Sequence, residues 1–114
     1  FLLCLGNADR GFSWAEFLDE KKAWRSRVFK DWGGKKVNGL SLAFTHFKAS
    51  AKELASSGDY DWIFYGHTHR PWKEEKDGAF LVNPGNVAGI RYAPTFAVLD
   101  TEQAKIELKL INKI

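Results

Sequence analysis

Three histidines and one asparagine in this chain follow short apolar segments and carry side chains that can bind a metal ion. His67 and His69 lie one residue apart in "DWIFYGHTHRP", His46 ends "LSLAFTH", and Asn7 ends "LLCLGN". Imidazole and amide ligands without nearby thiols suit Mn²⁺, Fe²⁺ or Zn²⁺ and argue against a cysteine-rich structural zinc site. We therefore take these four residues as candidate metal ligands.

Each candidate also has an ordinary structural explanation. A single His-x-His is a weak signal, a lone histidine is commonly a loop or core residue, and an asparagine after glycine commonly sits in a turn. The shared position after apolar strands is the stronger indication, because the carboxyl ends of strands in an α/β sheet lie where loops converge. We therefore expect Asn7, His46, His67 and His69 to meet in space, and no carboxylate at an obvious strand end completes the set.

Turn dipeptides and alternating residues predict the strands that would position these ligands. Asn38-Gly39 and Asp77-Gly78 each lie between strand-like segments, and such dipeptides are typical of two-residue hairpins. In the last segment Ile106, Leu108 and Leu110 alternate with charged residues, which predicts a strand with one solvated face. The chain therefore contains several short strands connected by tight turns.

Two Ser-x-x-Glu pairs predict helices. Ser13 with Glu16 is typical of a capping box and predicts a helix from Trp14 whose apolar stripe extends towards Val28. Ser50 with Glu53 repeats the pattern and predicts a short helix that ends at Gly58. Helices between strands favour an α/β fold.

Composition limits the domain count, the partners and the compartment. The 114 residues are 45% apolar, which suits one domain, and the net charge of +3 comes from scattered residues rather than a basic run, so nucleic acid is not indicated. The apolar opening is too short for a membrane span, and Cys4, the single cysteine, favours a reducing compartment such as the cytoplasm. The chain has no methionine and begins inside a strand-like segment, so we expect it to be a fragment.

The ordered motifs "GNAD", "FTH", "GHTHRP" and "NPGN", followed by Arg91 and "PTFAVLD", resemble the later motifs of the calcineurin-like metallophosphoesterases. The resemblance covers nearly the whole chain and is closest to the small bacterial and archaeal phosphodiesterase branch. It implies an α/β fold, a four-layer αββα sandwich, of which residues 1–114 form the incomplete C-terminal part. The oligomeric state does not follow from it.

The same resemblance implies a division of the ligands between two divalent ions. Asn7, His46 and His67 would bind one ion and His69 the other, with an aspartate bridging them. That aspartate belongs to the Asp-x-His and Gly-Asp-x-x-Asp motifs, which precede the Gly-Asn motif in the family and are absent from this chain. Mn²⁺ is the expected metal, with Fe²⁺, Zn²⁺ and Ni²⁺ as alternatives, and the chain alone is expected to be inactive.

The resemblance further implies hydrolysis of a phosphate ester, most naturally a phosphodiester, by a hydroxide that the two ions activate. Arg91 would bind the phosphate, unless it is an ordinary solvated loop charge. Ala8 stands where many members of the family have a histidine that assists the leaving group, so we assign no catalytic residue in this chain. The alternative is a non-catalytic scaffold, since a retromer subunit resembles these enzymes and serves protein binding.

Overall fold

The computed structural model of the chain describes residues 2–4, 6 and 27–113. Its elements in chain order are β1 (Leu2–Cys4), β2 (Arg27–Phe29), β3 (Trp32–Val37), β4 (Leu40–Thr45), α2 (Lys48–Ser57), β5 (Trp62–Phe64), β6 (Trp72–Lys76), β7 (Ala79–Asn83), β8 (Thr95–Asp100), β9 (Lys105–Leu110) and a 3₁₀ helix (Ile111–Lys113). Asn7 and the helix expected from Trp14 lie outside the described residues. The extension of that helix to Val28 is wrong, because Val28 pairs with Leu3 in a parallel sheet.

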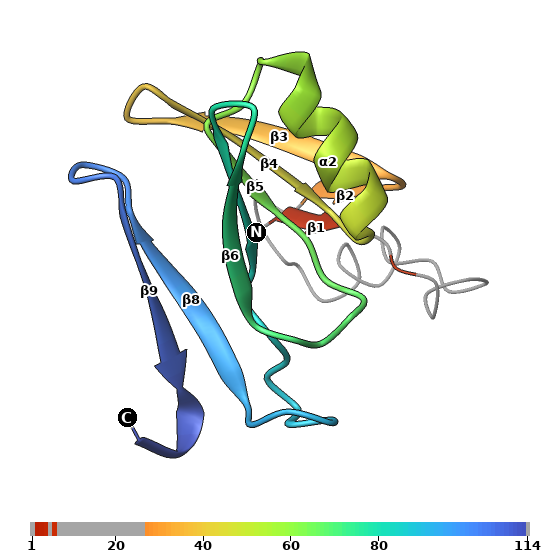
Figure 1. Cartoon of the computed structure of the whole chain (residues 1–114), viewed down its shortest axis with the longest axis vertical. Helices are drawn as coiled ribbons and strands as arrows, with labels where there is room; N and C mark the ends of the chain where they lie inside the picture. Colours follow the sequence, from red (N-terminus) through yellow and green to blue (C-terminus); the bar gives the residue numbers. More distant parts are fainter. Residues whose placement is uncertain (1, 5, 7–26, 114) are drawn as a thin grey trace.

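A five-stranded mixed sheet organises the described part of the chain, with the strand order β3-β4-β5-β7-β6. The central strands β4, β5 and β7 run parallel, whereas the outer strands β3 and β6 are antiparallel to their neighbours. Helix α2 connects β4 to β5 and lies on one face of the sheet (Figure 1). The carboxyl ends of β4, β5 and β7 consequently lie at the same edge.

The expected hairpins are confirmed, and their turns have the backbone that their residues favour. Asn38 and Gly39 have φ angles of 48° and 80°, and Asp77 and Gly78 have φ angles of 52° and 83°. Two consecutive residues at positive φ are the mark of a type I′ turn. Strands β8 and β9 pair antiparallel, as the alternation of residues 105–110 predicts.

The core between α2 and the sheet is made of small and aliphatic side chains. Ala51 and Ala55 of the helix are fully buried, and they belong to one cluster with Ala43, Ile63 and Leu81 of the sheet. Gly58 ends the helix at a φ of 76°, as predicted. The helix nevertheless begins at Lys48, so Ser50 is not its N-cap; Phe47 takes that position without a side-chain hydrogen bond. Burial of the alanine face outweighs the weaker capping preference.

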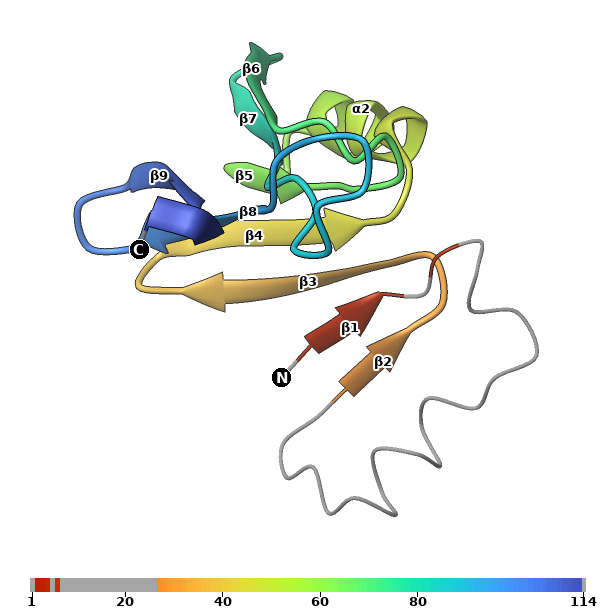
Figure 2. The same ribbon diagram turned by 90° about the horizontal axis from the view of Figure 1, so that it is seen from below.

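The opposite face of the five-stranded sheet is covered by the two-stranded sheets. A Cβ at Gly33 would lie 2.5 Å from the Phe44 ring and 2.7 Å from the Phe29 ring, so β2 packs closely on β3 and β4. Figure 2 shows β1 and β2 on the side of the sheet away from α2. Ala97, Ile106 and Leu108 of the β8–β9 hairpin line a hollow with Val82 of β7. The described residues therefore form three layers: helix, sheet and sheet.

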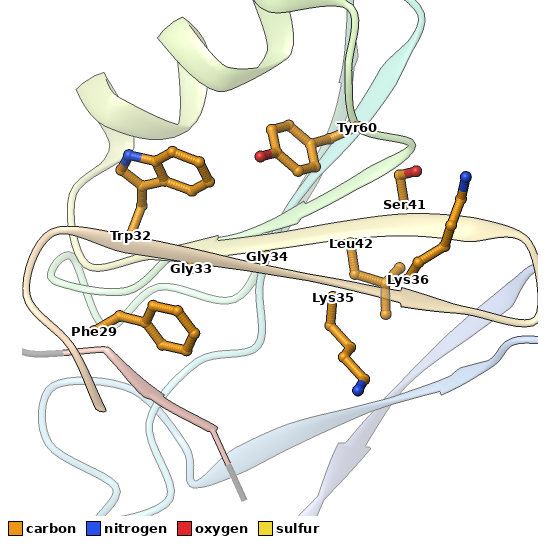
Figure 3. A pocket seen from close by; sticks show the side chains of 9 residues that line it. All are labelled: Phe29, Trp32, Gly33, Gly34, Lys35, Lys36, Ser41, Leu42 and Tyr60. Carbon is orange, nitrogen blue, oxygen red and sulfur yellow. The ribbon is translucent and has the colours of Figure 1, made fainter. Parts of the chain in front are cut away.

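A hollow of about 530 Å³ surrounds the edge strand β3. In Figure 3, Trp32 and Tyr60 lie on one side of this strand, and Phe29 and Lys35 lie on the other. Trp32 and Tyr60 meet edge to face with ring centroids 5.9 Å apart.

No helix in the described part of the chain is long and apolar enough to cross a membrane.

Candidate metal centre

His46 and His67 come together just beyond the carboxyl ends of β4 and β5. The two strands are parallel neighbours, and the backbone amide of Gly66 donates a hydrogen bond to the His46 carbonyl at 3.0 Å. This backbone contact places the two histidines side by side, with His46 Nε2 and His67 Nδ1 3.1 Å apart. The sheet therefore brings together two ring nitrogens from residues twenty-one positions apart.

The separation of these ring nitrogens fits a shared metal ion. A divalent ion at about 2.0–2.1 Å from each nitrogen, with an angle of roughly 90–110° between the two bonds, would hold the nitrogens about 2.9–3.4 Å apart. The observed 3.1 Å lies within this range. The separation of the two nitrogens is therefore compatible with a shared ion, and it is equally the distance of a hydrogen bond between the two rings.

Aromatic and glycine contacts hold the two rings in place. The Phe47 ring lies 4.7 Å from the His46 ring and 4.8 Å from the His67 ring, measured between centroids. A Cβ at Gly6 would lie 2.8 Å from Nδ1 and Cε1 of His46, so only glycine lets the chain after β1 approach this ring. Gly6 and Phe47 thus both lie close to the His46 ring.

Asn83, the last residue of β7, hydrogen-bonds to the loop that carries His67. Asn83 is fully buried, and its Nδ2 donates hydrogen bonds to the Gly66 carbonyl at 3.3 Å and to Thr68 Oγ1 at 2.9 Å. Its Oδ1 accepts a hydrogen bond from the Gly85 amide at 3.0 Å. The first asparagine of "NPGN" therefore connects the histidine loop to the following loop, a role that its sequence position did not reveal.

The backbone of both loops is constrained. His67 and His69 have φ angles of 66° and 60°, a region that few residues other than glycine adopt. Gly85 has a φ of 84°, and a Cβ there would overlap the Thr95 hydroxyl, which donates a hydrogen bond to the Pro84 carbonyl. Strained residues persist where the surroundings determine them, and they gather at functional sites.

Replacing Asn83 by aspartate is expected to lower the free energy of unfolding by about 1–3 kcal/mol, because the two donor bonds to the histidine loop are lost in a buried place. Asn86→Asp is the matched control, since Asn86 Oδ1 accepts a hydrogen bond from the Ala88 amide that an aspartate oxygen can also accept. The control should change stability by less than about 0.5 kcal/mol. Urea unfolding of both variants measures this, and equal losses would contradict the anchoring role.

Of the three remaining predicted site residues, His69 and Arg91 lie in the described part of the chain. His69 is half-buried in the same loop, and Arg91 is exposed in the 84–94 loop with a φ of 68°. Asn7 directly follows Gly6 in the sequence but lies outside the described residues. Within the described part of the chain, no group of three or more His, Cys, Asp or Glu side chains could hold a metal ion.

Polar groups that the sequence did not single out lie on the α2 side of the histidine loop. Lys48 Nζ approaches Glu74 Oε1 to 3.4 Å and lies 5.9 Å from the centre of the Tyr65 ring. Burial raises the pKa of Tyr65, so its phenol stays neutral, although Lys48 opposes this effect. Burial also acts to raise the pKa of Glu74, but the Trp72 indole and Lys48 outweigh it and hold that pKa below its usual value.

Comparisons with known proteins find relatives of this chain. Residues 1–104 match the family model described as the calcineurin-like phosphoesterase superfamily domain. The chain is 33% identical over 93 residues to phosphodiesterase MJ0936 of Methanocaldococcus jannaschii; the match covers 79% of this chain and 53% of that protein. The chain therefore spans about half the length of that curated relative.

Two solved structures share the fold. A novel archaeal phosphodiesterase superposes with a TM-score of 0.82 at 27% identity, covering 96% of this chain and 68% of the other. Vps29 from Entamoeba histolytica, complexed with Zn²⁺, superposes with a TM-score of 0.58 at 18% identity, covering 94% of this chain and 78% of the other. The predicted α/β fold of the metallophosphoesterase type is confirmed.

Proposed function

The chain belongs to the calcineurin-like phosphoesterase superfamily, and from this premise we propose that the whole protein is a metal-dependent phosphoesterase that hydrolyses phosphodiesters. The observation that carries the proposal is the 3.1 Å separation of His46 Nε2 and His67 Nδ1 at the carboxyl ends of two parallel strands. The relative from Methanocaldococcus jannaschii is named a phosphodiesterase, which supports the same proposal. The proposed substrate is a small-molecule phosphate ester.

The ligand assignment extends from this pair to its neighbours in sequence. Asn7 would join His46 and His67 at one ion, supported by the close approach of Gly6 to the His46 ring. His69 would bind the second ion, supported by its place two residues after His67 in the same constrained loop. The aspartate and histidine ligands that complete a two-metal centre would come from parts of the whole protein that this chain does not contain.

When bound, two divalent ions would lower the pKa of a water molecule and neutralise charge on the phosphate. We propose Mn²⁺, because neutral imidazole and amide ligands suit a borderline to hard divalent ion; Fe²⁺, Zn²⁺ and Ni²⁺ suit the same set. The chain's own residues position these ligands through the Asn83 hydrogen bonds and the Phe47 contacts.

The electrostatic environment favours an anionic ligand. Helix α2 begins two residues after His46 without a side-chain cap, so the amides of its first turn contribute a partial positive charge near the pair. Lys48 and Arg70 lie on the α2 side of the histidine loop, where Lys48 pairs with Glu74. The start of α2 would therefore help to stabilise a phosphate group close to the histidines.

Arg91→Ala is expected to raise KM for a phosphodiester about tenfold and to leave kcat nearly unchanged, if the guanidinium binds the phosphate equally in the ground and transition states. The proposal rests on the exposed position of Arg91 in the loop after "NPGN". Steady-state kinetics of the whole protein measure both constants. A fall in kcat with KM unchanged would show that Arg91 acts in the transition state instead, and no change in either would make it an ordinary surface charge.

Metal-dependent hydrolysis by the whole protein separates an enzyme from a scaffold. Vps29 shares the fold of this chain, so the fold alone does not distinguish an enzyme from a scaffold. The presence of His46, His67 and His69 favours the enzyme. The whole protein is expected to hydrolyse bis(p-nitrophenyl) phosphate with Mn²⁺ and to stop after chelation. Inactivity with two bound ions would favour the scaffold.

The cytoplasm is our proposed location, supported by the single cysteine.

A further inference from the structure

Strand β3 is an outer strand of the five-stranded sheet, and its one strand partner in the described part of the chain is β4. Lys36 of β3 lies opposite Ser41 of β4. The Ser41 carbonyl accepts a hydrogen bond from the Asp61 amide at 2.8 Å, and the Ser41 amide donates one to Asp61 Oδ2 at 2.7 Å. Both backbone groups of Ser41 therefore bond away from β3. In an antiparallel pair this marks a non-hydrogen-bonded position, so the amide and carbonyl of Lys36 point to the open edge.

Gly34 and Trp32 present their backbone groups at the same edge. Hydrogen-bonded and non-hydrogen-bonded positions alternate along an antiparallel pair, so both residues share the position of Lys36. Gly34 is exposed, and a glycine has only backbone atoms to expose. A Cβ at Gly34 would lie 3.3 Å from the Tyr60 ring, which lies on the α2 side of the strand (Figure 3). The edge of β3 therefore offers a row of accessible hydrogen-bond donors and acceptors, a template on which another strand can pair.

Two adjacent lysines make this edge positive on both faces of the sheet. Lys35 and Lys36 are exposed, and because neighbouring side chains of a strand alternate, they point to opposite faces (Figure 3). Neither belongs to an ion pair formed between described residues. Asp61 lies beside Ser41, but its Oδ2 is bonded to the Ser41 amide, and Asp31 precedes the other end of the strand. The two ammonium groups are therefore available to a partner.

The charge of the edge selects its occupant. Lysines on an edge strand oppose pairing with a second copy of the same strand, because such pairing gathers the lysines of both copies on one ribbon. An acidic strand instead places a carboxylate opposite each lysine. Trp32, which is 47% exposed and lies four residues before Lys36 on the same face, would contact an apolar side chain of that strand.

We propose that the open edge of β3 binds an extended acidic segment of a partner protein, which pairs with the five-stranded sheet as a further strand. Backbone hydrogen bonds to Trp32, Gly34 and Lys36 hold the segment. Two adjacent carboxylates, opposite Lys35 and Lys36, distinguish it from other extended chains. The inference uses none of the candidate metal ligands and does not depend on the phosphoesterase function.

The test is binding of a fluorescent peptide, Val-Thr-Val-Glu-Glu-Val-Thr-Val, to the whole protein by fluorescence anisotropy. Its sequence reads the same in both directions, so parallel and antiparallel pairing are tested together. It should bind about tenfold more tightly than the same peptide with Lys-Lys at its centre. Lys35→Glu/Lys36→Glu should reverse this preference, and tight binding of the lysine peptide shows that the variant is folded. Lys52→Glu/Lys105→Glu is the matched control, because it changes the net charge equally at exposed lysines of α2 and β9; it should keep the preference.

A second measurement distinguishes strand pairing from charge attraction alone. N-methylation of both glutamates keeps the carboxylates and removes the amides that would pair with β3, so the methylated peptide should bind about tenfold more weakly to the unmodified protein. By nuclear magnetic resonance, the acidic peptide should slow hydrogen exchange of the Gly34 and Lys36 amides. It should leave the Lys35 amide, which points to β4, unchanged.

The inference is overturned if the acidic peptide does not bind, if it binds no more tightly than the lysine peptide, or if its preference survives the charge reversal at Lys35 and Lys36. Full affinity of the methylated peptide would equally overturn it, because binding would then need charge and no strand. Self-association of the unmodified protein that protects the same amides without peptide would show that a second copy occupies the edge instead.

Discussion

The 114-residue chain by itself is expected to show no metal-dependent hydrolysis of bis(p-nitrophenyl) phosphate, whereas the whole protein is expected to hydrolyse it with Mn²⁺. The reason is the distribution of ligands. In the proposed assignment His46 and His67 hold one ion, and the second ion would have only His69 from this chain. No carboxylate in the described part of the chain joins the histidines to bridge two ions. In-line attack on phosphorus with two ions needs both in place.

Metal binding distinguishes this explanation from simple unfolding of the shorter chain. Circular dichroism should show that the 114-residue chain retains helix and sheet, and calorimetry should show at most one weakly bound Mn²⁺. The whole protein should bind two. Hydrolysis by the 114-residue chain that is abolished by chelation would mean that its own residues form a working centre and would contradict the ligand assignment.

Replacing His67 by alanine in the whole protein is expected to reduce turnover by about a hundredfold or more. Loss of a residue that merely orients a metal ligand already costs about 10–100-fold, so loss of a ligand should cost more. The ring nitrogen that is removed lies 3.1 Å from His46 Nε2. Initial-rate assays with saturating Mn²⁺ measure the turnover. The amount of metal bound to the purified variant shows whether a metal ligand has been lost.

His67→Gly is the control that distinguishes the loss of the imidazole ring from strain in the loop backbone. His67 has a φ of 66°, a conformation that glycine adopts at no cost, so the glycine variant removes the imidazole and relaxes the loop at the same time. It should fold at least as well as the alanine variant and be equally inactive, and added imidazole should restore part of its activity and metal binding. Full activity in the glycine variant would show that His67 serves the loop conformation and not a metal.

Local sequence signals predicted most of the strands correctly because their physical cause is local. Asn38-Gly39 and Asp77-Gly78 adopt positive φ with little strain, so each closes its hairpin wherever the rest of the chain goes. Gly58 ends α2 for the same reason. The start of α2 was predicted incorrectly, because the Ser50–Glu53 pattern offers one capped turn whereas Ala51 and Ala55 gain burial against the sheet.

The sequence by itself determined the order and residue types of the candidate ligands, the hairpin turns and, through the ordered motifs, the family resemblance that the comparisons confirm. Only the tertiary structure decided which ligands meet. His46 and His67 come within 3.1 Å because β4 and β5 are parallel neighbours, and Asn83 reaches their loop because β7 is the next strand in the sheet. Contacts between residues this far apart depend on strand order and register, which no local pattern in the chain encodes.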